Sequence, residues 1–200
     1  MHFFKTALTT ALGLLSVPAF SQLTPQEVVE NINILTAKSQ ALQAPANSIT
    51  IINGPLIVIG LGPFPPIIAG FSDIIQTVTN DIAAMAQDPQ YAPGPDSDNI
   101  FNAFREFVRV HQQLLNILIG KAGLFQTVPL IGEPVAQVLR SLEAIVDTVA
   151  FGLIDTVQSR SADIQAQASS LDVTIGNAIK SYEGLLIKAK ERRHAKDFQV

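Results

Sequence analysis

A histidine within an apolar helical pattern is the residue of this sequence best suited to holding a polar ligand group. His111 follows Val108 at helical spacing, and Arg109 lies beside it in the sequence. An imidazole offers hydrogen-bonding nitrogens, and a guanidinium pairs with carboxylates. We therefore predict His111 and Arg109 as a carboxylate anchor. The alternatives are a core histidine with one satisfied nitrogen and an arginine that is a solvated helix charge.

Seven apolar side chains are predicted to line a cavity around this anchor. Each lies on the apolar face of a predicted helix, and apolar pockets with a few polar groups are the usual form of small-molecule sites. The predicted lining residues are Phe71, Ile75, Phe104, Val108, Leu115, Leu142 and Ile175. Aromatic and aliphatic side chains at helical spacing more often fill a core, so core packing is the alternative interpretation.

The common catalytic motifs are missing from the sequence. It contains no cysteine, hence no thiol nucleophile, and no Gly-x-Ser-x-Gly turn of a secreted esterase. It also lacks a His-Glu-x-x-His zinc motif and an acidic calcium loop. Spacing alone does not exclude a carboxylate pair for glycoside hydrolysis, but the chain has no tryptophan for sugar stacking. We predict a non-enzymatic protein with no cofactor and no metal, and a hydrolase is the alternative.

The composition is that of a globular chain rich in apolar and poor in charged side chains. Of 200 residues, 48% are hydrophobic and 15% are charged, against about 25% charged in an average domain. The net charge is −4, and acidic residues interrupt the basic ones near the C-terminus, so no nucleic-acid partner is expected. Such a chain is predicted to form one domain with a large core.

The N-terminus has the pattern of a secretory signal. Lys5 precedes the apolar run 6–17, and Ala19-Phe20-Ser21 supplies small residues for cleavage after Ser21 or, alternatively, after Ala19. We therefore expect a secreted protein that is extracellular or associated with the cell wall. The predicted division is a signal peptide at 1–21, a helical domain that binds a hydrophobic ligand or surface at 22–190, and a charged C-terminal tail at 191–200.

The segment Ile49–Phe71 is uncharged and contains four prolines. A run of about 20 apolar residues would normally suggest a transmembrane helix. Each proline removes a backbone donor and clashes with the preceding helical turn, which argues against a membrane span. We predict an irregular apolar segment covered by protein. The alternative is that it walls an apolar cavity or contacts an apolar surface.

Apolar residues at helical spacing dominate the remaining sequence, and no segment alternates as a strand would. Thr24 and Glu27 form a capping box for a first helix ending near Gln43. Pro66, then Ser97 or Asp98, then Pro134 are predicted to begin the next three helices. The pattern 154–185 fits one long helix or two, with Gly152 or the run 158–161 as candidate breaks. The predicted fold is all-α, a four- to five-helix bundle with the proline-broken apolar segment between the first two long helices.

Three stretches of the sequence carry a family resemblance: LTPQEVVENINILTAKSQALQAPANS at 23–48, GPFP at 62–65 and IIAGF at 67–71. They resemble the fungal hydrophobic surface-binding protein A family, which includes the cell-wall galactomannoproteins. The resemblance implies a secreted helical protein without known catalysis. It also implies adsorption to hydrophobic surfaces, recruitment of polyester-degrading enzymes there, and, in some related domains, fatty acids enclosed between the helices. This chain lacks the long Ser/Thr-rich tail of the wall mannoproteins.

The sequence contains more apolar residues than the helix faces need to cover one another. This excess and the family resemblance lead to two functional expectations. The first is a secreted protein that binds fatty acids or other hydrophobic molecules in an apolar cavity between helices. The second is a protein that coats hydrophobic surfaces and recruits a secreted polyester hydrolase, or that has a structural and antigenic role in the cell wall. The expected partners are a lipid or a hydrophobic surface.

Overall fold

The structure, a computed structural model, describes residues 23–53, 56, 59–85, 90–125 and 132–197, with the backbone alone at 82–85 and 184–197. The predicted signal peptide lies outside these residues. The described part of the chain is built of helices, which confirms the predicted all-α class. The elements are α1 (Pro25–Ala41), α2 (Gln43–Asn47), α3 (Phe64–Met85), α4 (Pro95–Ala122), η2 (Gly123–Phe125), α5 (Gly132–Thr156), η3 (Gln158–Arg160) and α6 (Ser161–Asp197).

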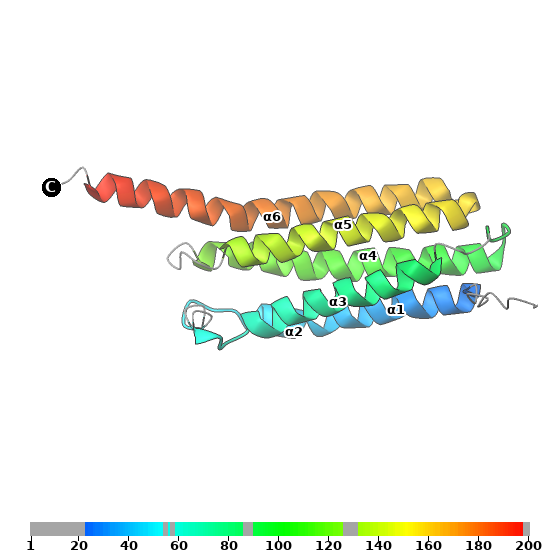
Figure 1. Ribbon diagram of the computed structural model, residues 1–200, viewed down its shortest axis with the longest axis horizontal. Coiled ribbons are helices and arrows are strands. Elements are labelled where there is room, and N and C mark those ends of the chain that lie inside the picture. Colours follow the sequence, from blue (N-terminus) through cyan, green and yellow to red (C-terminus); the bar gives the residue numbers. More distant parts are fainter. Residues whose placement is uncertain (1–22, 54–55, 57–58, 86–89, 126–131, 198–200) are drawn as a thin grey trace, which may run out of the picture.

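The five long helices lie side by side in an elongated bundle (Figure 1). Helices α1, α4 and α6 run in one direction, and α3 and α5 run in the opposite direction. Each long helix packs on two others, in the closed order α1, α4, α6, α5, α3 and back to α1. This arrangement gives the bundle a single central core.

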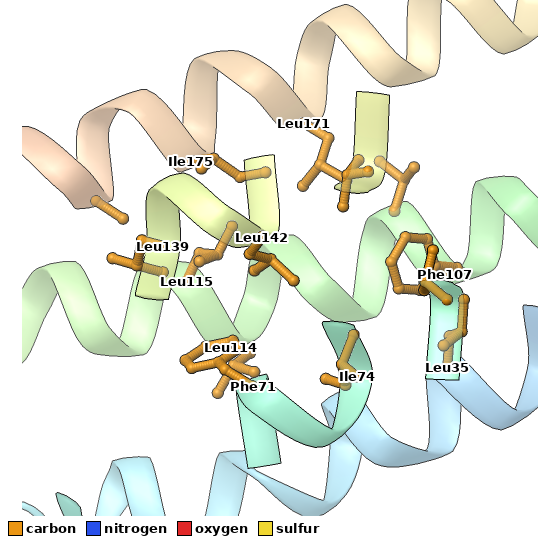
Figure 2. Packing of buried hydrophobic residues seen from close by; sticks show 14 of the residues in the cluster. Leu35, Phe71, Ile74, Phe107, Leu114, Leu115, Leu139, Leu142, Leu171 and Ile175 are labelled. Atoms are coloured by element: carbon orange, nitrogen blue, oxygen red, sulfur yellow. The ribbon is translucent and has the colours of Figure 1, made fainter. Parts of the chain in front are cut away.

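The core is apolar and receives side chains from every long helix. Figure 2 shows Leu35 of α1, Phe71 of α3, Leu115 of α4, Leu142 of α5 and Ile175 of α6 directed into the shared interior. All five side chains are buried. Burial of such side chains contributes about 1.5–3 kcal/mol each, so this shared interior holds the helices together.

The start of α1 agrees with the sequence prediction. The Thr24 hydroxyl accepts a hydrogen bond from the Glu27 backbone N–H, and the Glu27 carboxylate accepts one from the Thr24 N–H, at 3.3 and 2.7 Å. This reciprocal pair satisfies two backbone donors that the first helical turn leaves free. It fixes where α1 begins.

The predicted starts of the next three helices fall a few residues late. Helix α3 begins at Phe64, α4 at Pro95 and α5 at Gly132. Proline is tolerated throughout a first helical turn, because the N–H groups there have no intrahelical partner. Ser97 does not cap α4, because its hydroxyl donates to the Ala92 carbonyl at 2.8 Å.

The long C-terminal pattern is divided into two helices. Helix α5 ends at Thr156, and η3 at Gln158–Arg160 separates it from α6. The break therefore lies at the predicted run 158–161, whereas Gly152 is inside α5. The backbone of α6 continues as a helix to Asp197, through most of the predicted tail at 191–200.

The apolar segment Ile49–Phe71 is not covered by protein along its whole length, so that prediction is wrong for its middle. Ile49 is buried, and the next buried residues in the described part of the segment are Pro63 and Phe64, where α3 begins. Between them the exposed fractions are 69% for Ile51, 88% for Ile52 and 68% for Ile59. The composition of an apolar run does not show which part faces water. No helix in the described part of the chain is long and apolar enough to span a membrane.

Candidate ligand-binding site

The central polar feature of the core is a hydrogen-bonded pair between α1 and α4. His111 is fully buried, and its Nδ1 lies 2.8 Å from the Ser39 hydroxyl oxygen. Ser39 also reaches the Leu35 carbonyl at 2.9 Å, one helical turn earlier. The other ring nitrogen of His111, Nε2, is buried and has no hydrogen-bond partner among the residues that the structure describes.

Aromatic rings surround His111. The ring centroids of Phe107 and Phe71 lie 5.3 and 6.1 Å from that of the imidazole. Burial among such groups disfavours the charged imidazolium and lowers the pKa of His111 to about 4. The side chain is therefore neutral at pH 7, with one nitrogen bonded to Ser39 and one available.

Arg109 does not lie beside His111 in space. Its guanidinium is on the exposed face of α4 and bonds the Glu106 carboxylate through Nε at 2.8 Å and Nη2 at 2.5 Å. Residues two apart on a helix face in different directions, which explains the separation. Of the two predicted anchor residues, the structure places only His111 in the core.

The predicted lining residues converge on one interior. Six of the seven are buried members of the same apolar core, and the seventh, Ile75, packs against it partly buried. Figure 2 shows how four of them, Phe71, Leu115, Leu142 and Ile175, face one another from different helices. In this structure their side chains contact each other, so a bound chain would replace helix–helix contacts. Their role in binding stays a prediction.

Ser39 is the residue of the site that sequence reasoning missed. Its position on the inner face of the first helix follows from the helical spacing, but its bond to His111 joins positions that are 72 apart in the chain. A serine at an otherwise apolar core position is the available signal, because a buried hydroxyl requires a partner.

A surface groove of about 400 Å³ lies between α1 and α4, away from His111. None of the predicted site residues lines it. Its lining is mainly amide, carboxylate and small side chains: Pro25, Gln26, Val29, Asn33, Asp96, Asn99, Asn102, Ala103 and Glu106. Because it is lined by other residues and lies on the surface, the groove is not the predicted cavity around His111.

The exposed residues Ile51 and Ile52 lie in a turn after α2 that is held by hydrogen bonds at its described residues. The Thr50 N–H donates to Asn53 Oδ1 at 2.7 Å, and Asn53 Nδ2 donates to the Ser48 carbonyl at 2.7 Å. Lys121 Nζ of α4 donates to the carbonyls of Asn47 and Ile49 at 3.0 and 2.9 Å. These bonds fix the base of the turn, at one end of the bundle (Figure 1).

The fold and the site together define an all-α bundle with a neutral, half-satisfied histidine at the centre of an apolar core. Among solved structures, the chain is similar to AfMP4p, whose crystal structure is a complex with palmitic acid. The TM-score is 0.69 at 15% identity, and the match covers 80% of this chain and 99% of the other. At this identity the likeness shows a shared fold. No family model and no curated protein sequence matches the chain.

Proposed function

We propose that this is a secreted, non-enzymatic protein that binds a fatty acid or another long-chain lipid between its helices. The observation that carries the proposal is the buried Nε2 of His111, which has no hydrogen-bond partner in the described part of a mainly apolar core. An unsatisfied buried polar atom costs about 1–3 kcal/mol, and the polar head of a ligand would remove that cost. The fold shared with a palmitate-bound protein supports the same conclusion.

The driving force for binding is burial of the acyl chain. Each methylene group transferred from water to an apolar site contributes about 0.8 kcal/mol. The residues predicted to line the site supply aliphatic and aromatic contacts from α3, α4, α5 and α6. Because these side chains pack together in this structure, the bundle has to expand to admit the chain. The energy of expansion is subtracted from the gain on burial.

Native mass spectrometry of the protein secreted from a eukaryotic host tests this proposal. We expect a stoichiometric added mass, or uptake of added palmitic acid, and extraction should yield the lipid. Substituting Leu142→Gln places an amide in the predicted lining and is expected to abolish uptake, whereas Gln113→Ala on the exposed face of α4 should leave it unchanged. A bare mass with no uptake of palmitic acid contradicts the proposal.

A second candidate function, adsorption to hydrophobic surfaces, is favoured by the exposed turn after α2. Four isoleucine and leucine side chains there are more than half exposed: Ile51, Ile52, Ile59 and Leu61. Apolar side chains gathered at one exposed place commonly mark a contact site. In this function the turn meets a wax or polyester surface, and the bound protein recruits a secreted hydrolase.

The adsorbed amount on a polyester film distinguishes the second candidate from the first. Ile52→Ser is expected to lower adsorption several-fold without changing palmitic acid uptake. Val173→Ser is the matched control, because Val173 is 65% exposed on α6, away from the turn. Equal adsorption by both variants excludes the turn as the contact.

A further inference from the structure

The Ser39–His111 pair determines which hydrogen-bonding role is left for a ligand. The single hydroxyl hydrogen of Ser39 can be donated to one of two acceptors within reach: the Leu35 carbonyl oxygen or, if it carries no proton, the imidazole Nδ1 of His111. If the hydroxyl donates to Leu35, then His111 Nδ1 carries the proton and donates to the serine oxygen. Both short contacts, at 2.9 and 2.8 Å, are then hydrogen bonds.

The opposite assignment makes one bond fewer. If the Ser39 hydroxyl donates to Nδ1, the contact with the Leu35 carbonyl has no hydrogen, and the imidazole proton moves to Nε2. That proton would be buried without an acceptor, because no described residue lies within hydrogen-bond distance of Nε2. A serine inside a helix also commonly donates to the carbonyl one turn earlier. The arrangement with protonated Nδ1 is therefore the more stable one.

With Nδ1 protonated, Nε2 presents a lone pair and no hydrogen. The groups known to contact the imidazole ring carry no charge: Phe71 of α3 and Phe107 of α4 are apolar, and Ser39 of α1, at Nδ1, is neutral. Arg109 is paired with Glu106 on the exposed face. An ionised ligand carboxylate at Nε2 would face the nitrogen lone pair, and no described cation lies there to pair with it. In the apolar core an unpaired charge is very unfavourable.

We propose that the ligand head group bound at His111 is a hydrogen-bond donor, that is, the hydroxyl of a long-chain alcohol or of an undissociated fatty acid. This inference rests on the proposed lipid-binding function and specifies its ligand. Nε2 of His111 accepts the hydroxyl hydrogen, while Ser39 holds the proton on Nδ1. An ester, a ketone or an ionised carboxylate offers only acceptors and leaves Nε2 unsatisfied.

Transfer of labelled lipids from phosphatidylcholine vesicles to the full protein tests the preference. The probes are 1-hexadecanol and methyl palmitate, and the measured quantity is the ratio of their uptake. Comparing this ratio between wild type and His111→Phe cancels the different affinities of the two lipids for the vesicle. We expect the alcohol-to-ester ratio to fall about tenfold in His111→Phe, the value of one buried hydrogen bond. Gln113→Ala should keep the wild-type ratio.

The outcomes separate this inference from the function on which it depends. An unchanged ratio in His111→Phe, with both lipids still bound, overturns the donor preference and leaves lipid binding intact. Failure of the wild-type protein to take up either lipid overturns both. Where His111→Phe does not fold, the ¹⁵N chemical shifts of His111 in the wild-type protein decide: we expect a protonated Nδ1 and a bare Nε2. A protonated Nε2 overturns the inference.

Discussion

The imidazole of His111 is held in the core with one nitrogen unsatisfied, and this arrangement lowers stability. We predict that His111→Phe raises the free energy of unfolding at pH 7 by about 1 kcal/mol, because a ring of similar shape replaces a buried, half-satisfied polar group. Ser39 keeps its bond to the Leu35 carbonyl in this variant. Urea denaturation gives the value. A loss of stability would mean that the Ser39–His111 bond outweighs the unsatisfied nitrogen.

Two titratable groups make stability depend on pH in opposite directions: His111 and Asp172 of α6. The Oδ1 atom of Asp172 is buried, and the described residues provide no donor for it in its ionised form, whereas the protonated carboxyl can hydrogen-bond to Asp147. Burial, together with the nearby carboxylates of Asp147 and Glu143, raises the pKa of Asp172 from 3.8 to about 6. Its contribution to stability is present below pH 3.8 and is lost as the pH rises to about 6. Burial lowers the pKa of His111 from 6.5 to about 4, so its contribution is present above pH 6.5 and is lost as the pH falls.

Because the contributions of Asp172 and His111 oppose each other, we predict that the stability of the wild-type protein changes little between about pH 4 and 6. Asp172→Asn removes the group that gains stability on acidification. We expect the melting temperature of this variant to exceed that of the wild type at pH 7, where the carboxylate repulsion is relieved. It should then fall as the pH is lowered from 6 to 4, because the unfolded chain takes up a proton at His111. A flat profile in Asp172→Asn would contradict this account.

Among the helices, α3 approaches the first part of the chain closely at a glycine. A Cβ atom at Gly70 would lie 2.3 Å from Leu42 Cδ2 and 2.9 Å from Cδ1. Leu42 is buried, so it has little room to move. We predict that Gly70→Ala destabilises the protein by about 1–2 kcal/mol, since the overlap exceeds the gain of up to about 1 kcal/mol in helix propensity.

Gly176→Ala is the matched control for this prediction. Gly176 lies inside α6, and a Cβ there would meet nothing within 4 Å. The propensity gain alone should then stabilise the protein by up to about 1 kcal/mol. Thermal unfolding of the two variants in parallel tests the difference in sign. If both alanines stabilise, the contact between α3 and Leu42 is looser than the structure indicates.

The elements were predictable where the signal is local. Helical spacing placed His111 on an inner face, and the capping box located the start of α1. The exact starts of α3 and α5 were not predictable, because proline fits several positions of a first turn. The exposure of Ile51 and Ile52 and the pairing of Ser39 with His111 depend on which segments meet in three dimensions. Contacts between segments that are far apart in the chain cannot be predicted from the local pattern of a single sequence.

At the scale of the whole molecule, the five helices of the closed ring differ in how extensively they pack on their neighbours. Helix α3 packs on α5 and more sparsely on α1, whereas α4 and α6 have extensive neighbours on both sides. The ion pair that joins α1 to α3, between Lys38 Nζ and Asp73 Oδ2 at 2.5 Å, is partly exposed, so its expected contribution is below about 1 kcal/mol. Helix α3 also carries Phe71, which lies against His111. Outward movement of α3 is therefore the least costly way to expose the buried imidazole.

Hydrogen exchange of the native protein tests this opening. Backbone amides of α3 should exchange faster than those of α4, because exchange through partial opening follows the local free energy of each element. Bound 1-hexadecanol should slow exchange in α3 more than elsewhere, since a ligand stabilises the state it binds and its chain would join α3 to α4 and α5. Equal protection of α3 and α4 in the free protein would rule out α3 as the moving helix. A ligand effect confined to the exposed turn after α2 would instead place the lipid at the end of the bundle, where Ile51 and Ile52 are exposed.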